Sequence, residues 1–250
     1  MSRMQTFGRA APQYDAHADF QHAQTERAFA AALAQWPSHL RIADIGCGTG
    51  RFAALAASQR PDWRIIGIDL AFGMCAAARA RCSTVQADMT QLPLAPASCD
   101  AALSSLCLQW VDDLPAAFHE IARILRPGGQ AIITSLGSGT LHELHTAAEQ
   151  GDLPLSLLPM RRADAYRNAL RASGLLGTVE EDVQIRYYPD LRALLDSMRR
   201  IGASYPTAQH RGLSGARRWT AMQAAYETLR VSGGLPATWK RLFITLRKPR

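Results

Sequence analysis

Three closely spaced glycines in the segment DIGCGTG make the clearest candidate binding loop. Gly46, Gly48 and Gly50 follow the apolar run LRIA and precede the helix-like segment RFAALAA. Glycine lets the backbone adopt positive φ angles and lets a ligand approach the main chain. The pattern therefore predicts a cofactor-binding turn between a strand and a helix, although a tight turn that binds nothing would use the same residues.

The residues around this loop limit the choice of cofactor. The dinucleotide fingerprint G-x-G-x-x-G needs a glycine where this chain has Arg51, and the acid Asp44 just before the turn would repel a pyrophosphate. A cation without phosphate would be accepted there. S-adenosylmethionine fits, because it carries a sulfonium and an amino group and has no phosphate. We therefore expect S-adenosylmethionine as cofactor and S-adenosylhomocysteine as product, with Asp44 and the three glycines in the site.

Acids also follow the next two predicted strands. Asp69 and Leu70 end the segment IGIDL, where a carboxylate can accept hydrogen bonds from both ribose hydroxyls, as an acid also does in NAD enzymes. The segment QADM, with Asp88 and Met89, resembles the adenine clamp of methyltransferases, in which the acid accepts from the exocyclic amine and the apolar neighbour lies along the ring. Asp88 would equally serve as a helix cap or turn residue.

A further predicted strand runs into the segment SSLCLQW. Leu106, Gln109 and Trp110 lie just past its end, where they would face the reactive methyl group. A tryptophan at a strand end also commonly packs in the core or its rim. We expect Leu106 to contact the cofactor, and Gln109 and Trp110 to contact the substrate.

Alternating strands and helices must position these residues. Periodicity predicts a helix over 16–36 and then strands separated by helices, which implies right-handed crossovers and a doubly wound, mostly parallel α/β sheet. Ligands bind at the carboxyl ends of the strands in such a sheet. The predicted strands are 41–45, 64–70, 83–88, 100–106, 130–136, 178–187 and 238–246, and the later helices are 51–59, 73–81, 113–125, 162–172, 190–201 and 215–231.

A chain of 250 residues is the size of one α/β domain with insertions. We expect a helical cap at 1–36, a Rossmann-like core at 37–188 and 235–250, and a helical insertion at 189–234 that covers the ligand edge as a lid. No apolar run is long enough to span a bilayer, and the N-terminus lacks the apolar centre of a signal peptide, so we expect a cytoplasmic protein.

Cysteine content and charge narrow the possible partners. The five cysteines are odd in number and form no C-x-x-C pair, so neither a disulfide framework nor a metal site is expected. Residues 1–150 hold 11 Lys and Arg against 13 Asp and Glu, whereas residues 151–250 hold 17 against 8. An acidic partner is therefore a candidate for the second part, although scattered solvated arginines would give the same excess.

Several segments together resemble one enzyme family over nearly the whole chain. They are FGRAAPQYDAHADFQ (7–21), DIGCGTG, DLAFGM, LPLAPASCDAALSSLCLQW, LRPGG, GTLHEL, IGA and GLPATW. In these segments the chain is similar to the malonyl-acyl carrier protein O-methyltransferases of biotin synthesis. The resemblance implies a class I methyltransferase fold and methyl transfer from S-adenosylmethionine to the free carboxylate of a malonyl thioester, carried by acyl carrier protein or coenzyme A.

The chemistry that this resemblance implies needs no general base. A malonyl carboxylate has a pKa near or below that of Asp, ~3.9, so it is ionised at neutral pH. Catalysis would rest on alignment of the reacting atoms. We expect Tyr14 to position the carboxylate, and His17 and Gln21 to contact the substrate, although His17 would also suit a structural role at a helix start. An arginine of the lid, Arg199 or Arg211, would supply the counter-charge.

One departure leaves other acceptors open. Where the family has a polar stretch with His and Asn, this chain reads AAEQGDLPLSLLPM at 147–160, which puts substrate identity in doubt more than fold or cofactor. The alternatives are another small-molecule carboxylate, a nucleic-acid methyltransferase, or a protein that binds the cofactor without turnover. We expect an acyl carrier protein partner that meets the basic lid, a monomer, and no binding to nucleic acid or membrane.

Overall fold

The computed structural model describes residues 3–153, 158, 160–203 and 213–250. Its strands occur in the order that the sequence predicts, and β5, β6 and β7 each extend further than expected. The strands are β1 (Arg41–Ile45), β2 (Arg64–Asp69), β3 (Ser83–Gln86), β4 (Cys99–Ser105), β5 (Leu125–Leu136), β6 (Leu176–Tyr188) and β7 (Leu235–Arg247).

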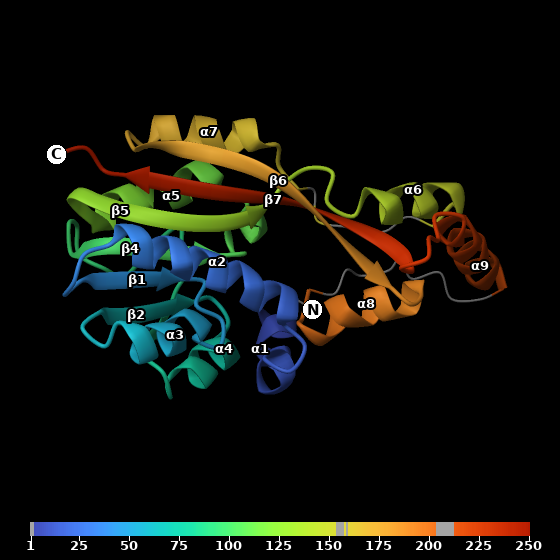
Figure 1. The fold of residues 1–250 in the computed structure, drawn as a ribbon, viewed down its shortest axis with the longest axis horizontal. Coiled ribbons are helices and arrows are strands. Elements are labelled where there is room, and N and C mark those ends of the chain that lie inside the picture. Colours follow the sequence, from blue (N-terminus) through green and yellow to red (C-terminus); the bar gives the residue numbers. More distant parts are fainter. Residues whose placement is uncertain (1–2, 154–157, 159, 204–212) are drawn as a thin grey trace.

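The strands form one sheet in the order β3-β2-β1-β4-β5-β7-β6 (Figure 1). β1 to β5 are parallel, whereas β7 pairs antiparallel with both β5 and β6. The carboxyl ends of β1, β2 and β4 therefore lie at one edge of the sheet, where ligands bind in open α/β folds. The predicted mostly parallel α/β architecture is confirmed.

Helices cover both faces of the sheet, and a group of helices extends beyond one end (Figure 1). Within the described residues, no helix is both long and apolar enough to cross a bilayer. The helices are α1 (Arg3–Tyr14), α2 (Asp19–Gln35), α3 (Arg51–Gln59), α4 (Phe72–Ala78), the short 3-10 helix η1 (Leu108–Trp110), α5 (Leu114–Ile124), α6 (His142–Gln150), α7 (Ala163–Ala172), α8 (Leu191–Arg200) and α9 (Leu213–Glu227).

Alternation along β1 separates two apolar cores. Ile42 packs on one face with Phe29 of α2 and Phe52 of α3. Ile45 faces the other side and belongs to the core that includes Phe118 of α5. Because successive strand residues point to opposite faces, an apolar strand of this kind is buried on both sides. This burial fixes the strand ends that carry the candidate site.

The N-terminal segment differs from the single helix predicted over 16–36. It forms two helices, α1 and α2, joined by a turn in which the His17 backbone N–H donates to the Tyr14 carbonyl oxygen at 3.0 Å. The Asp15 carboxylate in this turn accepts a hydrogen bond from the Thr49 hydroxyl at 2.6 Å. The prediction of a helix start at 16 was wrong, because this turn is held by contacts with the glycine loop that periodicity does not show.

A third apolar cluster lies under α6, α8 and α9. Figure 1 shows the ends of β6 and β7 reaching out to these helices. The cluster includes Leu144, Leu194, Tyr226 and Trp239. The Glu143 carboxylate of α6 accepts from the Thr238 backbone N–H at 3.1 Å and from the Thr238 hydroxyl, which joins α6 to β7. α6 thus packs with α8 and α9, although it precedes the 189–234 range in the chain.

α1 crosses α4 at two glycines. A Cβ added to Gly73 would lie 2.4 Å from the Gly8 carbonyl oxygen, whereas a Cβ on Gly8 would make only an ordinary contact, 3.7 Å from the Gly73 nitrogen. Glycine at position 73 therefore permits the close approach of α1 to the sheet edge.

Gly73→Ala should lower the free energy of unfolding by about 1–3 kcal/mol, because α1 must move to admit the methyl group. Gly8→Ala is the matched control and should leave stability unchanged or slightly raised, since alanine favours a helix. Thermal unfolding of the two variants checks this. If the two variants had equal melting temperatures, the close contact of α1 with α4 at Gly73 would be contradicted.

Candidate active site

The glycine loop connects the carboxyl end of β1 to the first turn of α3. Its glycines all have positive φ: 76° at Gly46, 53° at Gly48 and 86° at Gly50. A Cβ on Gly46 would lie 2.5 Å from Cys107 Sγ, so a larger residue has no room there. A Cβ on Gly48 would meet nothing within 4 Å. The backbone at Gly48 is therefore open to the approach of a ligand.

The Asp69 carboxylate stands at the end of β2 and faces this loop. Its Oδ2 accepts a hydrogen bond from the Gly48 backbone N–H at 3.0 Å, and its Oδ1 accepts one from the Ala71 backbone N–H at 2.8 Å. Burial raises the pKa of Asp69, and these donors offset the rise only in part. Each carboxylate oxygen has a further lone pair, so Asp69 can still accept hydrogen bonds from the hydroxyls of a ribose.

A second carboxylate, that of Asp44, is buried beneath the loop with 2% of its surface exposed. Its Oδ2 has no hydrogen-bond partner in the part of the chain that the structure describes. Burial, and then the negative charge of Asp69, raise the pKa of Asp44 to about 8. An unpaired buried carboxylate is costly, and a bound cation would offset that cost. Asp44 therefore fits the cationic cofactor predicted from the sequence.

Asp88 and Met89 follow β3. Asp88 Oδ1 accepts hydrogen bonds from both the Thr90 backbone N–H and the Thr90 hydroxyl, each at 2.8 Å. Asp88 therefore stabilises a turn, which is one of the two roles that the sequence allowed for it. It also lines the cavity described below. Met89 is buried, and its Sδ lies 3.7 Å from Cys107 Sγ. The two roles of Asp88 are compatible, because the turn uses only one of its two oxygens.

The turn after β4 brings Leu106 and Trp110 to the same edge. Leu106 has a left-handed φ of 52°, and its backbone N–H donates to the Thr134 carbonyl oxygen at 2.9 Å. A non-glycine residue in this region stores strain and is often found at functional sites. Trp110 packs edge-on against Phe7 of α1, with 5.2 Å between ring centroids. α1 and η1 thus form adjoining walls of one cavity.

This cavity, called the cofactor cavity below, has a volume of about 580 Å³ and opens at the carboxyl ends of the parallel strands. That volume lies within the range of ~300–1,000 Å³ usual for small-molecule sites. Asp44 lines an adjoining space of about 40 Å³ that shares Tyr14, Gly46 and Gly48 with the cofactor cavity. The predicted residues that line the cofactor cavity are Tyr14, Gly46, Gly48, Asp69, Leu70, Asp88, Met89, Leu106 and Trp110.

Comparisons with known proteins agree with this architecture. A sequence model of the methyltransferase domain family matches residues 43–133. The malonyl-[acyl-carrier protein] O-methyltransferase of Herminiimonas arsenicoxydans is 38% identical, over 98% of this chain and 95% of the relative. That of Dechloromonas aromatica (strain RCB) is 34% identical, over 98% and 93%. This chain belongs to the malonyl-[acyl-carrier protein] O-methyltransferase family.

A solved structure shows the same fold at low sequence identity. The YcgJ protein from Bacillus subtilis superposes with a TM-score of 0.64, covering 92% of this chain and 99% of that chain, at 19% identity. The superposition covers most of this chain, so the fold class of this O-methyltransferase family member is shown independently of its sequence relatives.

Tyr14, the last residue of α1, lines both the cofactor cavity and the space at Asp44. Burial raises the pKa of its phenol, and the charges of Asp69 and Asp15 raise it further. The hydroxyl therefore stays protonated at neutral pH. It can donate a hydrogen bond but cannot act as a base, which suits the positioning role predicted for it.

Sequence reasoning missed Asp15, which ties the α1–α2 turn to the glycine loop. Its carboxylate accepts from Arg81 at 2.9 Å as well as from the Thr49 hydroxyl, and Arg81 also donates to the Thr49 carbonyl oxygen at 2.9 Å. Burial opposes ionisation, but these donors lower the pKa of Asp15 overall. The available signal was the motif YDAH, in which Asp15 follows Tyr14 directly.

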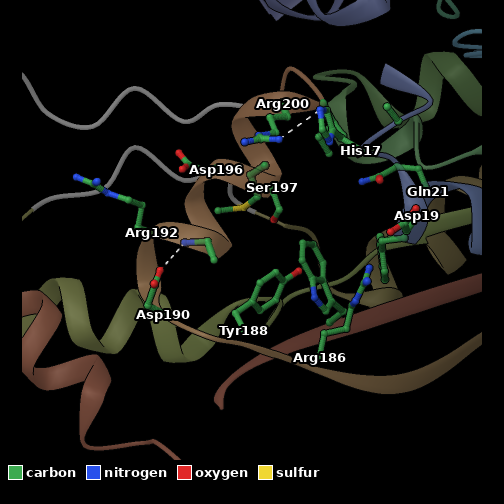
Figure 2. A pocket seen from close by; sticks show the side chains of 16 residues that line it. His17, Asp19, Gln21, Arg186, Tyr188, Asp190, Arg192, Asp196, Ser197 and Arg200 are labelled. Carbon is green, nitrogen blue, oxygen red and sulfur yellow. Dashed lines mark hydrogen bonds between the residues drawn. The ribbon is translucent and has the colours of Figure 1, made fainter. Parts of the chain in front are cut away.

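His17 and Gln21 face a different cavity, called the second cavity below. It has a volume of about 530 Å³ and lies between the α1–α2 segment, the ends of β6 and β7, and α8 (Figure 2). Arg200 Nη1 lies 3.4 Å from His17 Nε2 across its edge. Gln21 lines both the second cavity and the 40 Å³ space at Asp44.

Two predicted substrate-binding residues line neither of the two large cavities. Gln109 is buried. Its side-chain nitrogen donates to the Leu106 carbonyl oxygen at 2.8 Å, and its Oε1 accepts from the Ser135 hydroxyl at 3.1 Å. Gln109 therefore stabilises the turn at Leu106. Arg199 is exposed and donates to Asp196 at 2.6 Å. Arg211 lies outside the described residues.

Among the residues that the structure describes, no group of three His, Cys, Asp or Glu side chains is placed to hold a metal ion.

Asp69→Ala should weaken S-adenosylmethionine binding about 10- to 100-fold, because hydrogen bonds to a charged acceptor are lost. Titration calorimetry measures the dissociation constant directly. Asp164→Ala, which removes an exposed carboxylate paired with Arg167 on α7, is the control and should bind as the parent protein does. An unchanged constant for Asp69→Ala would remove Asp69 from the site.

The raised pKa of Asp44 predicts that binding of the cofactor is coupled to the release of a proton. With its pKa raised to about 8, the carboxyl is mostly protonated at pH 7 in the free protein, and a cation bound beside it favours the ionised form. Binding should therefore release a proton at pH 7, and affinity should rise as the pH increases from 6 to 8. Calorimetry in buffers of different ionisation enthalpy should detect this release in the parent protein and not in Asp44→Asn. The same release in both would show that Asp44 does not pair with the cofactor.

Proposed function

We propose that this protein transfers a methyl group from S-adenosylmethionine to the free carboxylate of a malonyl thioester and so forms its methyl ester, in biotin synthesis. The observation that carries the proposal is the similarity, over 98% of the chain, to a malonyl-[acyl-carrier protein] O-methyltransferase at 38% identity. The site supports it, because an open glycine loop and an unpartnered buried acid suit a cationic cofactor.

The residues of the cofactor cavity fit S-adenosylmethionine. When bound, this cofactor supplies a methyl group activated by its positively charged sulfur. Asp44 would offset the positive charge, Asp69 would accept hydrogen bonds from the ribose hydroxyls, and Asp88 with Met89 would hold the adenine. Leu70, exposed by 47% at the cavity wall, would add apolar contact.

The acceptor chemistry needs positioning rather than a base. A malonyl carboxylate is ionised at neutral pH, since its pKa lies near or below ~3.9. Tyr14 keeps its proton, and burial raises the pKa of the thiols of Cys47 and Cys107, so these groups are neutral as well. The chain would then contribute a hydrogen bond from Tyr14 and apolar walls at Leu106 and Trp110 that exclude water from the reacting atoms.

The thioester carrier would be acyl carrier protein. Residues 151–250 hold 17 Lys and Arg against 8 Asp and Glu, and α8 and α9 carry part of this excess. Arg192, Arg200 and Arg217 are exposed on these two helices. An acidic carrier would be steered toward such a surface, which gives the helical insertion at 189–234 a role as a lid that also meets the partner.

Malonyl-acyl carrier protein incubated with this protein and S-adenosylmethionine should gain the mass of one methyl group. Acetyl-acyl carrier protein, which lacks a free carboxylate, is the control and should gain nothing. Intact-protein mass spectrometry measures the mass of the acyl carrier protein in both samples. If the malonyl form stays unchanged while calorimetry shows that the cofactor binds, the acceptor is a different molecule.

A further inference from the structure

The second cavity is large enough to hold a ligand and is not needed for the cofactor. Buried apolar side chains form its interior, among them Phe20 of α2, Met198 of α8 and Trp239 of β7. Half-buried polar groups, Gln21 and Tyr188, lie between them. Such a lining suits a slender ligand with few polar atoms along its length.

Three guanidinium groups line this cavity, from Arg186, Arg192 and Arg200. None of the three forms an ion pair with a carboxylate among the described residues, and Arg200 contacts the imidazole of His17. Unpaired guanidinium groups around a cavity favour an anionic ligand, because arginine binds carboxylate and phosphate with two parallel donors.

The acids near these arginines are already engaged. Asp190 Oδ1 caps α8 by accepting from the Ala193 backbone N–H at 2.7 Å, and Asp196 Oδ1 accepts from Arg199 at 2.6 Å. Asp19 lies in the first turn of α2, where the helix dipole favours a negative charge. These three carboxylates also line the second cavity, but among the described residues none lies within ion-pair distance of Arg186, Arg192 or Arg200, so those guanidinium groups are available to an incoming anion.

The arginines differ in depth. Arg192 and Arg200 are exposed at the rim on α8, whereas Arg186 is half-buried and lies 5.9 Å from the centre of the Phe20 ring. In Figure 2, Arg186 and Gln21 lie on one side of the cavity and Ser197 of α8 lies on the other. An anion is therefore best accommodated at the rim, with the rest of the ligand directed inward.

Shared lining residues relate the second cavity to the glycine loop. Gln21 lines both the second cavity and the 40 Å³ space, and Tyr14 with Gly46 lines both that space and the cofactor cavity. A ligand that enters at α8 and extends past Gln21 would bring its tip to Tyr14.

Resting on the proposed function, we propose that the second cavity holds the phosphopantetheine arm of the thioester. Arg192 and Arg200 bind its phosphate at the rim, and the apolar interior encloses the pantetheine chain. The malonyl end then reaches Tyr14 past Gln21. The phosphate is common to acyl carrier protein and coenzyme A, and in the first it marks the place where the carrier docks.

The test compares acceptors that differ by one group. Initial rates of methylation are measured with malonyl-pantetheine, malonyl-4′-phosphopantetheine, malonyl-coenzyme A and malonyl-acyl carrier protein, for the parent protein and for Arg192→Met, Arg200→Met and the double variant. We expect the parent protein to prefer the phosphorylated arm, and each substitution to lower kcat/KM for malonyl-4′-phosphopantetheine about tenfold. The rate with malonyl-pantetheine should stay within about twofold, because it has no phosphate to bind.

A double variant, Arg64→Met with Arg171→Met, removes the same number of exposed charges from β2 and α7 without touching the second cavity. It should keep the preference for phosphate. Ser197→Phe, which would fill the cavity, should lower the rate with every thioester while the calorimetric affinity for S-adenosylmethionine stays unchanged. Comparison of malonyl-coenzyme A with the carrier protein shows which source of the phosphate the rim favours.

The outcomes separate this inference from the proposed function. If the parent protein uses malonyl-pantetheine as well as its phosphorylated form, or if the rim variants slow both acceptors equally, the phosphate is not bound at Arg192 and Arg200. The inference then fails while carboxyl methylation stands. If no malonyl thioester is methylated, carrier protein included, the proposed function itself fails.

Discussion

A buried carboxylate, Asp44, and a half-buried one, Asp69, lie at neighbouring strand ends and set the electrostatics on which this structure depends. β1 and β2 run parallel and in register, so Asp44 and Asp69 approach the same edge beneath the glycine loop. Each is desolvated, and the charge of Asp69 adds to the rise in the pKa of Asp44. The parallel sheet brings these two carboxyl groups together, which makes their ionisation unfavourable, and a cationic ligand offsets this free-energy cost. A cation bound here would let Asp44 ionise, so the site favours a positively charged ligand.

The N-terminal segment joins the two halves of the site. Asp15 links the α1–α2 turn to Thr49 of the glycine loop and to Arg81. Tyr14, one residue earlier, forms part of the cofactor cavity, and His17, two residues later, lines the second cavity. A displacement of this turn would therefore change both cavities at once. The close crossing at Gly73 holds α1 in place from the other side.

The structure brings the residues predicted for the cofactor together more completely than those predicted for the acceptor, for a physical reason. Gly48, Asp69 and Asp88 follow parallel strands, and the ends of such strands meet at one edge whatever the loop lengths. Arg199 and Arg200 lie on an exposed helix, where a step of one residue turns a side chain by about 100°. Periodicity could not show that Arg200 lines the second cavity while Arg199 pairs with Asp196. Gln109 follows a strand too, but a short 3-10 turn directs it inward to Ser135.

The two cavities are built from different elements, so the acceptor of such a protein can change while its cofactor site stays the same. The cofactor cavity is built from strand ends that the two main apolar cores hold rigid. The second cavity is built from α8, the ends of β6 and β7, and the α1–α2 segment. α8, the strand ends and Phe20 of α2 rest on a separate apolar cluster with α6 and α9. Because the two cavities have no described lining residue in common, substitutions on α8 can alter which thioester enters while leaving Asp44 and Asp69 undisturbed. Gln21 of the second cavity and Tyr14 of the cofactor cavity meet at the small space beside Asp44, so a substitution at either position would affect the place where the two ligands approach each other.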